Sequence, residues 1–332
     1  MASKFHFSLN SIKPQKSTAQ GNLTSVTSKE VPGFEKISFQ NLKLNKSSSF
    51  DPIWHPNANK IGYVVAGSVL ISMHTPKSNE IFQASQGEMF FIPRGYVHYI
   101  ASMNDSEAEI IFALDATQPE LMQLTKASFS LSNEVFQQTL HTKPEFFDGL
   151  KKAKKDDLFK TVSKLPSASS SSRYKFNIAK SKKPITTKGG YLQVGTKPNL
   201  ETLDGLAILG FGLTPNGAVE PHWHTNAGEL VYIVKGHTQI TVLSPDGSVE
   251  VMDVKGGEGA FAPASHFHNI LNVGKDDVEV IAFFNSEDPD YIGFGEVVGS
   301  YSNEMLGSIF NVQPNYFDQF KKPTGPLVIV PV

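Results

Sequence analysis

Short apolar runs, separated by turn residues, recur along most of the chain. Residues 278–284 form a nearly continuous apolar run, whereas 237–243 alternates apolar and polar positions and ends at the Ser-Pro-Asp-Gly of 244–247. Alternation with a period of two is typical of strands, and Ser-Pro-Asp-Gly is typical of a turn. We predict strands at 206–213, 229–234, 237–243, 249–254, 259–263 and 278–284 and, in the N-terminal half, near 62–72 and 89–92. Short strands at this spacing favour an antiparallel barrel or jelly roll.

Each half of the chain ends in a stretch with helical features. Ser132-Asn133-Glu134 and Ser302-Asn303-Glu304 both place a capping residue before an apolar pattern of helical period. Residues 144–152 and 314–321 predict a second short helix in each tail. We expect these tails to cover a barrel edge or to dock onto the other barrel.

The chain also repeats itself. Trp54-His55-Pro56-Asn57-Ala58 recurs as Trp223-His224-Thr225-Asn226-Ala227, at an offset of 169 residues, and His98 corresponds to His268 at an offset of 170. A match over so long a separation predicts a duplicated structural unit. The serine-rich stretch 167–172 is typical of a linker. We therefore expect two domains, an N-terminal barrel at 1–168 and a C-terminal barrel at 169–332.

The repeat extends to strands that lead into each half, around Phe7 and Phe176. We expect these lead-in strands and the helical tails to exchange between the halves. Such an exchange would bury the aromatic side chains of the tails, namely Phe146, Phe147, Tyr316 and Phe317.

Composition narrows the class of protein. A length of 332 residues suits two domains. The net charge of −2 favours neither nucleic acid nor an anionic membrane as a partner. The absence of cysteine excludes disulfides and thiolate sites. No apolar run suits a signal peptide or a membrane helix. We expect a cytoplasmic protein that binds a small-molecule ligand and has no nucleic-acid or membrane partner. The sequence is compatible with a homo-oligomer.

The C-terminal half contains a candidate metal site made of His222, His224, Glu229 and His268. His222 and His224 are two residues apart, so on a strand both imidazoles face the same side. Glu229 opens the next strand after a turn, and His268 must arrive from a different strand. Three imidazoles and a carboxylate suit a divalent transition metal. The alternative is that these histidines are packed, hydrogen-bonded core residues.

Two nearby residues are candidates for supporting roles. His266 has the strand parity of His268, so it either donates a hydrogen bond to a ligand of the metal or lies at the rim of the barrel. Asn272 is a candidate for the pocket or for the surroundings of the ligands.

These residues and their spacing resemble the two motifs of the cupin superfamily. The duplicated arrangement is similar to bicupins of the oxalate decarboxylase and germin-like group. The resemblance implies an all-β fold of two tandem jelly-roll barrels, each with a short helical tail. It also implies one divalent metal per chain on His222, His224, Glu229 and His268. Manganese is the first choice, followed by iron, zinc or nickel.

The N-terminal half departs from this pattern. Ile53 stands where the first histidine would be and Lys60 where the glutamate would be, so that only His55 and His98 remain. Two histidines beside a lysine make a poor site for a divalent ion, and we expect this barrel to be metal-free and mainly structural. The Lys60 ammonium either occupies the metal position or lies solvated at the surface.

The residue that binds the substrate in the family is also replaced. Oxalate decarboxylases typically carry an arginine, which grips a carboxylate, three residues before the first motif histidine. Here Val219 and, in the first half, Phe50 occupy that position. Glu220 would repel a dianion if it faced inward. Oxalate is therefore a doubtful substrate.

A polar segment at 286–290 lies roughly where the family carries a mobile loop with a catalytic acid. Under that interpretation Glu287 or Asp290 is the general acid or base, with Gly293 and Gly295 as hinges. The alternative is a polar turn before the helical tail.

Two functions of different class fit these features. The first is a metal-dependent enzyme, of the decarboxylase or oxidase type, acting on a small carboxylate or keto acid. The second is a non-catalytic ligand-binding or storage-like bicupin with a structural metal. A nucleic-acid regulator has little support, because the charge is near neutral and no helix-turn-helix is present.

Overall fold

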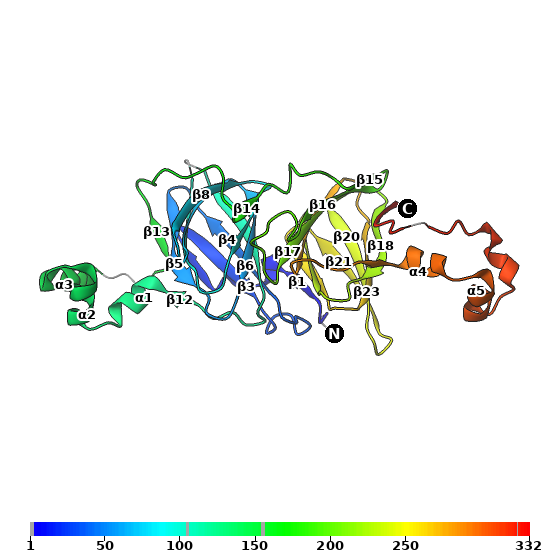
Figure 1. Cartoon of the computed structure of the whole chain (residues 1–332), viewed down its shortest axis with the longest axis horizontal. Coiled ribbons are helices and arrows are strands. Elements are labelled where there is room, and N and C mark those ends of the chain that lie inside the picture. Colours follow the sequence, from blue (N-terminus) through cyan, green and yellow to red (C-terminus); the bar gives the residue numbers. More distant parts are fainter. Residues whose placement is uncertain (1–2, 104–105, 154–156, 324) are drawn as a thin grey trace. The chain divides into compact units, whose positions relative to one another are not determined.

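The computed structural model describes residues 3–103, 106–153, 157–323 and 325–332. Its internal contacts divide the chain into two compact units (Figure 1). The C-terminal unit comprises Met1–Lys13, Val26–Lys36 and Asn177–Val332. The N-terminal unit comprises Pro14–Ser25 and Ile37–Phe176. The boundary after residue 168 stays a prediction of where the two repeats join.

The C-terminal unit is built from two antiparallel sheets in the described part of the chain. One has the strand order β1-β22-β19-β24-β17-β16-β15 and the other β21-β20-β23-β18-β25, with β26 also paired to β18. The strands are β1 (His6–Ser8), β15 (Ile185–Thr187), β16 (Gly190–Gly195), β17 (Ala207–Leu213), β18 (Gly217–Trp223), β19 (Glu229–Lys235), β20 (His237–Leu243), β21 (Val249–Lys255), β22 (Glu258–Ala262), β23 (Phe267–Asn272), β24 (Val278–Phe284), β25 (Ile292–Gly293) and β26 (Ile329–Pro331).

The N-terminal unit repeats this arrangement. Its sheets have the orders β14-β9-β6-β11-β4-β3-β2 and β12-β5-β10-β7-β8, with β13 also paired to β5. The strands are β2 (Lys16–Thr18), β3 (Gly21–Val26), β4 (Ser38–Leu44), β5 (Ser48–Trp54), β6 (Lys60–Ala66), β7 (Ser68–His74), β8 (Asn79–Ser85), β9 (Met89–Ile92), β10 (Val97–Ser102), β11 (Ala108–Leu114), β12 (Met122–Gln123), β13 (Phe159–Thr161) and β14 (Lys175–Phe176). The predicted all-β fold of two tandem barrels is confirmed.

The hydrophobic pattern explains where each strand lies. β24 is almost wholly apolar and lies inside its sheet, between β19 and β17, whereas β21 alternates exposed and buried positions at a sheet edge. The expected strand region 62–72 is divided into β6 and β7 by Gly67, whose φ of 73° is a conformation that glycine adopts without a steric cost.

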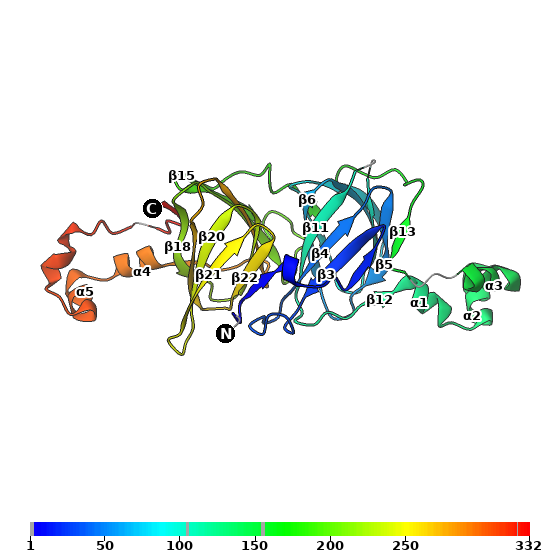
Figure 2. The ribbon, with the colours of Figure 1, turned by 180° about the vertical axis from the view of Figure 1, so that it is seen from behind.

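The lead-in strands exchange between the halves of the sequence, as predicted. β1, at the start of the chain, lies beside β22 of the C-terminal barrel (Figure 2). Phe7 is the register partner of Gly259. β14, which belongs to the second repeat by sequence, pairs with β9 of the N-terminal barrel. Each barrel is therefore completed by a strand from the other repeat.

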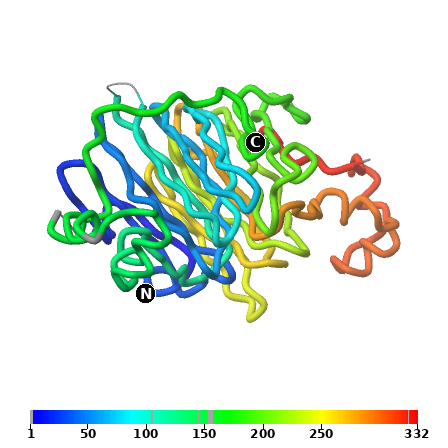
Figure 3. The backbone as a smooth tube through the Cα atoms, turned by 60° about the vertical axis from the view of Figure 1, so that its left-hand side comes forward, coloured from blue at the N-terminus to red at the C-terminus, as the bar shows by residue number. Residues whose placement is uncertain are grey.

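The helical tails do not exchange, which corrects the second part of that expectation. The N-terminal tail contains α1 (Leu124–Phe129), α2 (Asn133–Leu140) and α3 (Pro144–Ala153), and the chain then returns to its own barrel as β13. The C-terminal tail, with α4 (Phe294–Ser300) and α5 (Asn303–Phe310), likewise returns to its barrel as β26 (Figure 3).

The predicted helix starts are confirmed, because Ser132 Oγ accepts a hydrogen bond from Val135 N and Ser302 Oγ accepts one from Met305 N. Residues 314–319 form a 3₁₀ helix, η2 (Pro314–Gln319), and a further 3₁₀ turn, η1 (Leu9–Ser11), follows β1.

The expected burial of the tail aromatics is only partly correct. Phe147 is buried and stacks on Phe136 within its own tail. Phe146 and Tyr316 are 48% and 61% exposed, and Phe317 is half-buried against Phe310. The reason is that the helices of each tail pack on one another, α2 on α3 and α5 on η2. No helix among the described residues is long and apolar enough to cross a membrane.

Candidate metal centre

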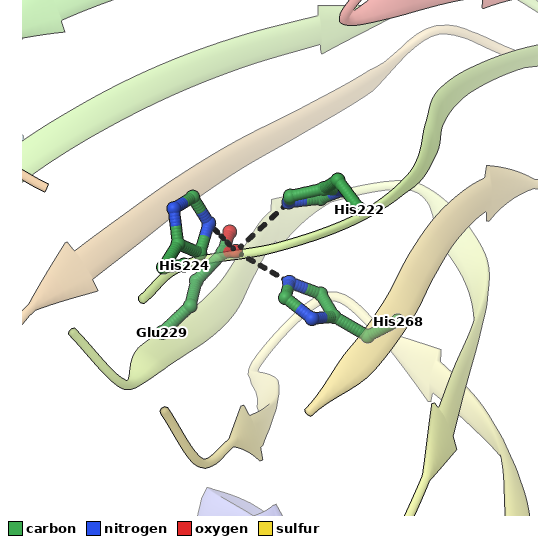
Figure 4. Close-up of side chains that lie close together, drawn as sticks. All are labelled: His222, His224, Glu229 and His268. Atoms are coloured by element: carbon green, nitrogen blue, oxygen red, sulfur yellow. Dashed lines mark hydrogen bonds and ion pairs between the residues drawn. The ribbon is translucent and has the colours of Figure 1, made fainter. Parts of the chain in front are cut away.

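Strands from both sheets of the C-terminal barrel bring the four predicted ligands together. His222 lies on β18 directly opposite His268 of β23, His224 follows the end of β18, and Glu229 opens β19. Figure 4 shows the three imidazoles converging on the carboxylate. Glu229 Oε2 lies 2.8 Å from His268 Nε2, 3.1 Å from His224 Nε2 and 3.5 Å from His222 Nε2. All four side chains are buried.

The imidazoles are held by main-chain carbonyl groups on their outer side. His222 Nδ1 donates to Glu220 O at 2.7 Å, His268 Nδ1 donates to His266 O at 2.7 Å, and His224 Nδ1 donates to Asp290 O. A carbonyl oxygen only accepts, so each Nδ1 carries the proton. In a neutral ring the lone pair of Nε2 then points to the centre of the cluster.

The electrostatics of the cluster call for a cation. Burial lowers the pKa of His222 to about 4, so this ring is neutral near pH 7. Burial raises the pKa of Glu229, but hydrogen bonds from the three imidazoles outweigh it and hold that pKa well below its usual range. Because each Nδ1 already donates to a carbonyl, such bonds from Nε2 require positively charged rings, whereas neutral rings turn their lone pairs toward the carboxylate. Glu229 Oε1 is buried and has no hydrogen-bond partner among the described residues. An anion facing three lone pairs is costly unless a positive ion lies between them.

The donor set therefore fits a divalent metal. Within the described residues, this is the one group of three or more His, Cys, Asp or Glu ligand atoms that lie within 4.8 Å of one another. Three imidazole nitrogens and one carboxylate oxygen suit first-row transition metals. On a six-coordinate ion, four protein ligands leave positions for water or a substrate.

An apolar cavity of about 150 Å³ adjoins His222 and His224. Tyr291 stacks on His222 with a centroid distance of 4.7 Å and forms part of the cavity wall. Among the described residues that line the cavity there is no lysine or arginine. The lining residues are Leu192, Leu209, Phe211, His222, His224, Pro289, Tyr291, Pro326 and Val328.

The carboxylates of the two candidate acids of the 286–290 segment bond to groups that do not line this cavity. The Glu287 carboxylate accepts a hydrogen bond from Gly205 N at 2.9 Å and pairs with Lys197 at 3.4 Å. The Asp290 carboxylate accepts from Thr225 Oγ1 at 2.6 Å, while its main-chain oxygen orients His224. A catalytic role for either acid stays a prediction, and it requires this segment to rearrange.

The other predicted residues support the site indirectly. His266 is half-buried, and its ring makes an edge contact with Phe5, while its main-chain oxygen orients His268. Asn272 is buried and bonds to main-chain groups at the far end of β23, including Leu213 O at 3.0 Å. Val219, at the position of the missing arginine, is part of the hydrophobic core.

Two residues of the site were not predicted as functional. Tyr291 was not singled out, and Glu220 was considered only as a group that would repel a dianion. The Glu220 side chain instead accepts hydrogen bonds from Tyr291 and from the main chain near the C-terminus. No local sequence signal identifies either residue, because their partners lie 71 to 108 residues away.

The equivalent position in the N-terminal barrel contains a buried lysine. Lys60 opens β6 as Glu229 opens β19, and its Nζ lies 4.0 Å from the centre of the Phe112 ring. Nδ1 of His55 and of His98 donates to a main-chain carbonyl, as in the His/Glu cluster of the C-terminal barrel. Their Nε2 atoms are buried and lack hydrogen-bond partners among the described residues. Lys60 is thus a core residue and not a solvated surface lysine.

Burial of Lys60 predicts a pH dependence for this barrel. Its pKa is lowered to about 7 by burial, whereas an unfolded lysine titrates at about 10.4. Between these values the unfolded chain binds a proton that the folded barrel does not, so the free energy of unfolding should rise with pH. His55 and His98 have lowered pKa values and stay neutral throughout this window.

The measurement is urea unfolding at several pH values between about 7 and 10. The chain has two tryptophans, Trp54 in the N-terminal unit and Trp223 in the C-terminal unit, so Trp54 fluorescence in a Trp223→Phe background follows this barrel alone. Lys60→Met should remove the slope. A slope that persists in Lys60→Met would show that other groups cause it.

Comparisons with known proteins agree with this architecture. Residues 7–146 and 176–316 each match the sequence model of the cupin family. Germin-like protein 11-1 of Oryza sativa is 30% identical over 114 residues, which cover 33% of this chain and 51% of that protein. Oxalate oxidase GF-3.8 of Triticum aestivum is 31% identical over 104 residues, which cover 30% of this chain and 46% of that protein. The match thus spans about half the length of these relatives.

A similar solved structure is that of oxalate decarboxylase from Bacillus subtilis. It superimposes with a TM-score of 0.89 at 18% identity and covers 100% of this chain and 88% of the bacterial chain. The bacterial enzyme is described with Mn(II) centres. At this identity the likeness concerns the fold. The two matched repeats, the two jelly-roll barrels and the His/Glu cluster together show that the chain is a bicupin and belongs to the cupin family.

Proposed function

We propose that this bicupin is a metal-dependent enzyme that acts on a small carboxylate or keto acid in its C-terminal barrel. The observation that carries the proposal is the convergence of three Nε2 lone pairs and the Glu229 carboxylate next to a cavity. One divalent ion per chain fits this donor set. Manganese is the first candidate, because the structurally similar bacterial enzyme contains Mn(II), followed by iron, zinc or nickel.

The chain's own residues divide the work between holding the ion and shaping the cavity. The three histidines bind through Nε2, and Glu229 neutralises part of the charge. A bound divalent metal supplies a Lewis acid that polarises substrate oxygen atoms. Leu209, Phe211 and Val328 line the cavity and exclude water from the reacting groups.

The cavity walls bear on the choice of substrate. The described lining of the cavity includes no lysine or arginine. A metal ion on the four predicted ligands would therefore be the main positive charge that a substrate meets there. A dianion such as oxalate would place its second carboxylate against apolar walls, which is unfavourable. A keto acid with a short apolar substituent fits better, because its polar end meets the metal and its apolar end meets Leu209 and Phe211.

We propose that the N-terminal barrel is metal-free. Lys60 supplies a cationic group where the C-terminal barrel has a carboxylate ligand, and Ile53 replaces one of the histidines. Both changes oppose the binding of a divalent ion.

A non-catalytic ligand-binding role is the second candidate. It is favoured by one observation: the Glu287 and Asp290 carboxylates are bonded to groups outside the cavity. In that case the metal would stabilise the barrel or hold a ligand without turnover.

The test is an activity assay of the full chain reconstituted with Mn(II), Fe(II), Zn(II) or Ni(II). Oxalate, glyoxylate, pyruvate and 2-oxobutyrate are supplied in turn, and the release of carbon dioxide and the consumption of oxygen are followed. We expect metal-dependent turnover of a keto acid that exceeds turnover of oxalate, with none in Glu229→Gln. A metal-loaded protein that converts none of them, but melts at a higher temperature when they are added, would favour the binding role.

A further inference from the structure

One buried carboxylate connects two segments that form walls of the metal cavity. Glu220 Oε1 accepts hydrogen bonds from Leu327 N and Val328 N, each at 2.9 Å, and from Tyr291 Oη at 3.1 Å. Its Oε2 accepts from Gly295 N at 3.3 Å. Tyr291 and Val328 both line the cavity. A single side chain thus holds both walls in place.

The main-chain groups of Glu220 add two further hydrogen bonds, one to Val328 and one to His222. The N–H of Glu220 donates to Val328 O at 2.8 Å, and its C=O accepts the proton of His222 Nδ1 at 2.7 Å. The residue that fixes the ring of one predicted metal ligand therefore also fixes the segment that covers the cavity. We call Pro326–Val328 the strap, because Pro326 and Val328 line the cavity just before β26 returns to the barrel.

Two glycines make room for this carboxylate. A Cβ atom on Gly293 would lie 2.5 Å from Glu220 Oε1, and one on Gly295 would lie 3.2 Å from Oε2. The equivalent residue of the N-terminal barrel is Asp51, which bonds instead to the Gln123 side chain at 2.8 Å. Gln123 pairs with Ile53 as Gly293 pairs with His222, so the chain there carries Gln123 and Thr125 at the positions of the two glycines. The arrangement thus belongs to the barrel that holds the His/Glu cluster.

The strap is strained where the carboxylate holds it. Val328 has a φ of 55°, in the left-handed region that β-branched residues rarely adopt. Such a conformation persists only where the surrounding contacts enforce it. The hydrogen bonds from Leu327 N and Val328 N to Glu220 Oε1 supply that constraint. The Glu220 N–H bond to Val328 O adds to the same constraint.

From these contacts we propose that the Pro326–Val328 strap is the gate to the metal cavity and that Glu220 is the latch that keeps it closed. Opening requires the loss of the bonds to Leu327 and Val328, and it exposes the imidazoles of His222 and His224. Glu220 is a positioning residue and touches no substrate. The gate rests on the cavity of the proposed site, and it requires neither bound metal nor catalysis.

The test measures access to the cavity with a probe that needs no metal. Diethyl pyrocarbonate transfers an ethoxycarbonyl group to the unprotonated Nε2 of histidine, with release of ethanol and carbon dioxide. Apo protein is treated with the reagent, and the modification of the peptide carrying His222 and His224 is followed by mass spectrometry. The exposed His74 of the N-terminal barrel reports the reagent's activity in the same sample.

Glu220→Ala removes the latch, and Glu220→Gln is its matched control because it keeps an acceptor oxygen of the same reach. We expect Glu220→Ala to raise the modification rate of His222 by about tenfold or more, with a far smaller change in Glu220→Gln. Hydrogen exchange at the amides of Leu327 and Val328 should accelerate in parallel. Faster amide exchange with an unchanged rate at His222 would overturn the gate.

A cross-link gives a second, reversible test in case Glu220→Ala does not fold. Ala218 and Val330 are partners across the β18–β26 pair, and the separation of such partners, about 4.5–5.5 Å between Cα atoms, suits a disulfide. The chain has no cysteine, so Ala218→Cys with Val330→Cys forms a single defined bond. Oxidation should slow the modification of His222, and reduction should restore it. Equal rates in the two forms would show that the strap does not control access.

Because the probe requires no ion, failure of the proposed enzyme and failure of the gate are separate results. A protein that binds no metal still reports the access rate. If the protein binds metal but the access rate is unchanged in every variant, the proposed metal site is supported and the gate is contradicted.

Discussion

Glu229→Gln is expected to reduce bound divalent metal from about one ion per chain to almost none. Glutamine keeps the volume of the buried side chain but removes the negative charge. Its amide group can donate hydrogen bonds to Nε2 of His224 and His268, which lie 3.1 and 2.8 Å from the present carboxylate oxygen. The same lone pairs then become unavailable to an ion. Mutation of residues that merely support metal ligands costs about 10–100-fold in affinity, so the loss of a ligand should cost at least as much.

The measurement is elemental analysis of purified protein by mass spectrometry after reconstitution, beside thermal unfolding with and without a chelator. Wild-type protein should melt at a lower temperature once the metal is removed. Glu229→Gln should be insensitive to the chelator, because its amide already satisfies the imidazoles. His55→Ala, the matched change in the N-terminal barrel, should retain the full metal content. Stoichiometric metal in Glu229→Gln would contradict the assignment of this cluster, and two ions per wild-type chain would contradict a metal-free N-terminal barrel.

Phe7→Ala is expected to destabilise the C-terminal barrel, although residue 7 lies at the start of the first repeat. The ring of Phe7 is buried and makes an edge contact with Phe34 at a centroid distance of 6.0 Å. It covers Gly259, where a Cβ atom would lie 2.5 Å from the ring. Truncating a buried phenylalanine to alanine typically costs about 3–5 kcal/mol, because apolar contacts are lost and a cavity remains.

The two tryptophans allow each barrel to be followed alone. In a Trp54→Phe background, Trp223 fluorescence during urea unfolding reports the C-terminal barrel, and in a Trp223→Phe background Trp54 reports the N-terminal one. Phe7→Ala should lower the midpoint of the Trp223 transition far more than that of the Trp54 transition. Phe146→Ala, at a ring that is 48% exposed, should change either midpoint by little. A larger loss at Trp54 would mean that β1 completes the N-terminal barrel and would contradict its pairing with β22.

The sequence by itself was sufficient for the two-barrel architecture and for the four members of the His/Glu cluster. The strands that were predicted from apolar runs and from alternation lie within one or two residues of the observed ones, because burial of one or both faces of a sheet imposes these patterns on the chain. The internal repeat revealed the duplication, and it showed that Ile53 and Lys60 replace two of the ligands in the first barrel. His222 and His224 could be placed on one face from their spacing alone, because strand geometry is local.

The tertiary structure decided what depends on contacts between distant segments. No local pattern predicts that the tails return to their own barrels, because an amphipathic helix has the same sequence signature whichever surface it covers. No local pattern directs the Glu220 side chain to the strap 107 and 108 residues away, or turns Glu287 toward Lys197. The burial of Lys60 was equally undecided, since a lysine that opens a strand can point into the barrel or out of it. In each case the outcome depends on which groups satisfy a buried charge or carbonyl, and those partners are chosen by the packed fold.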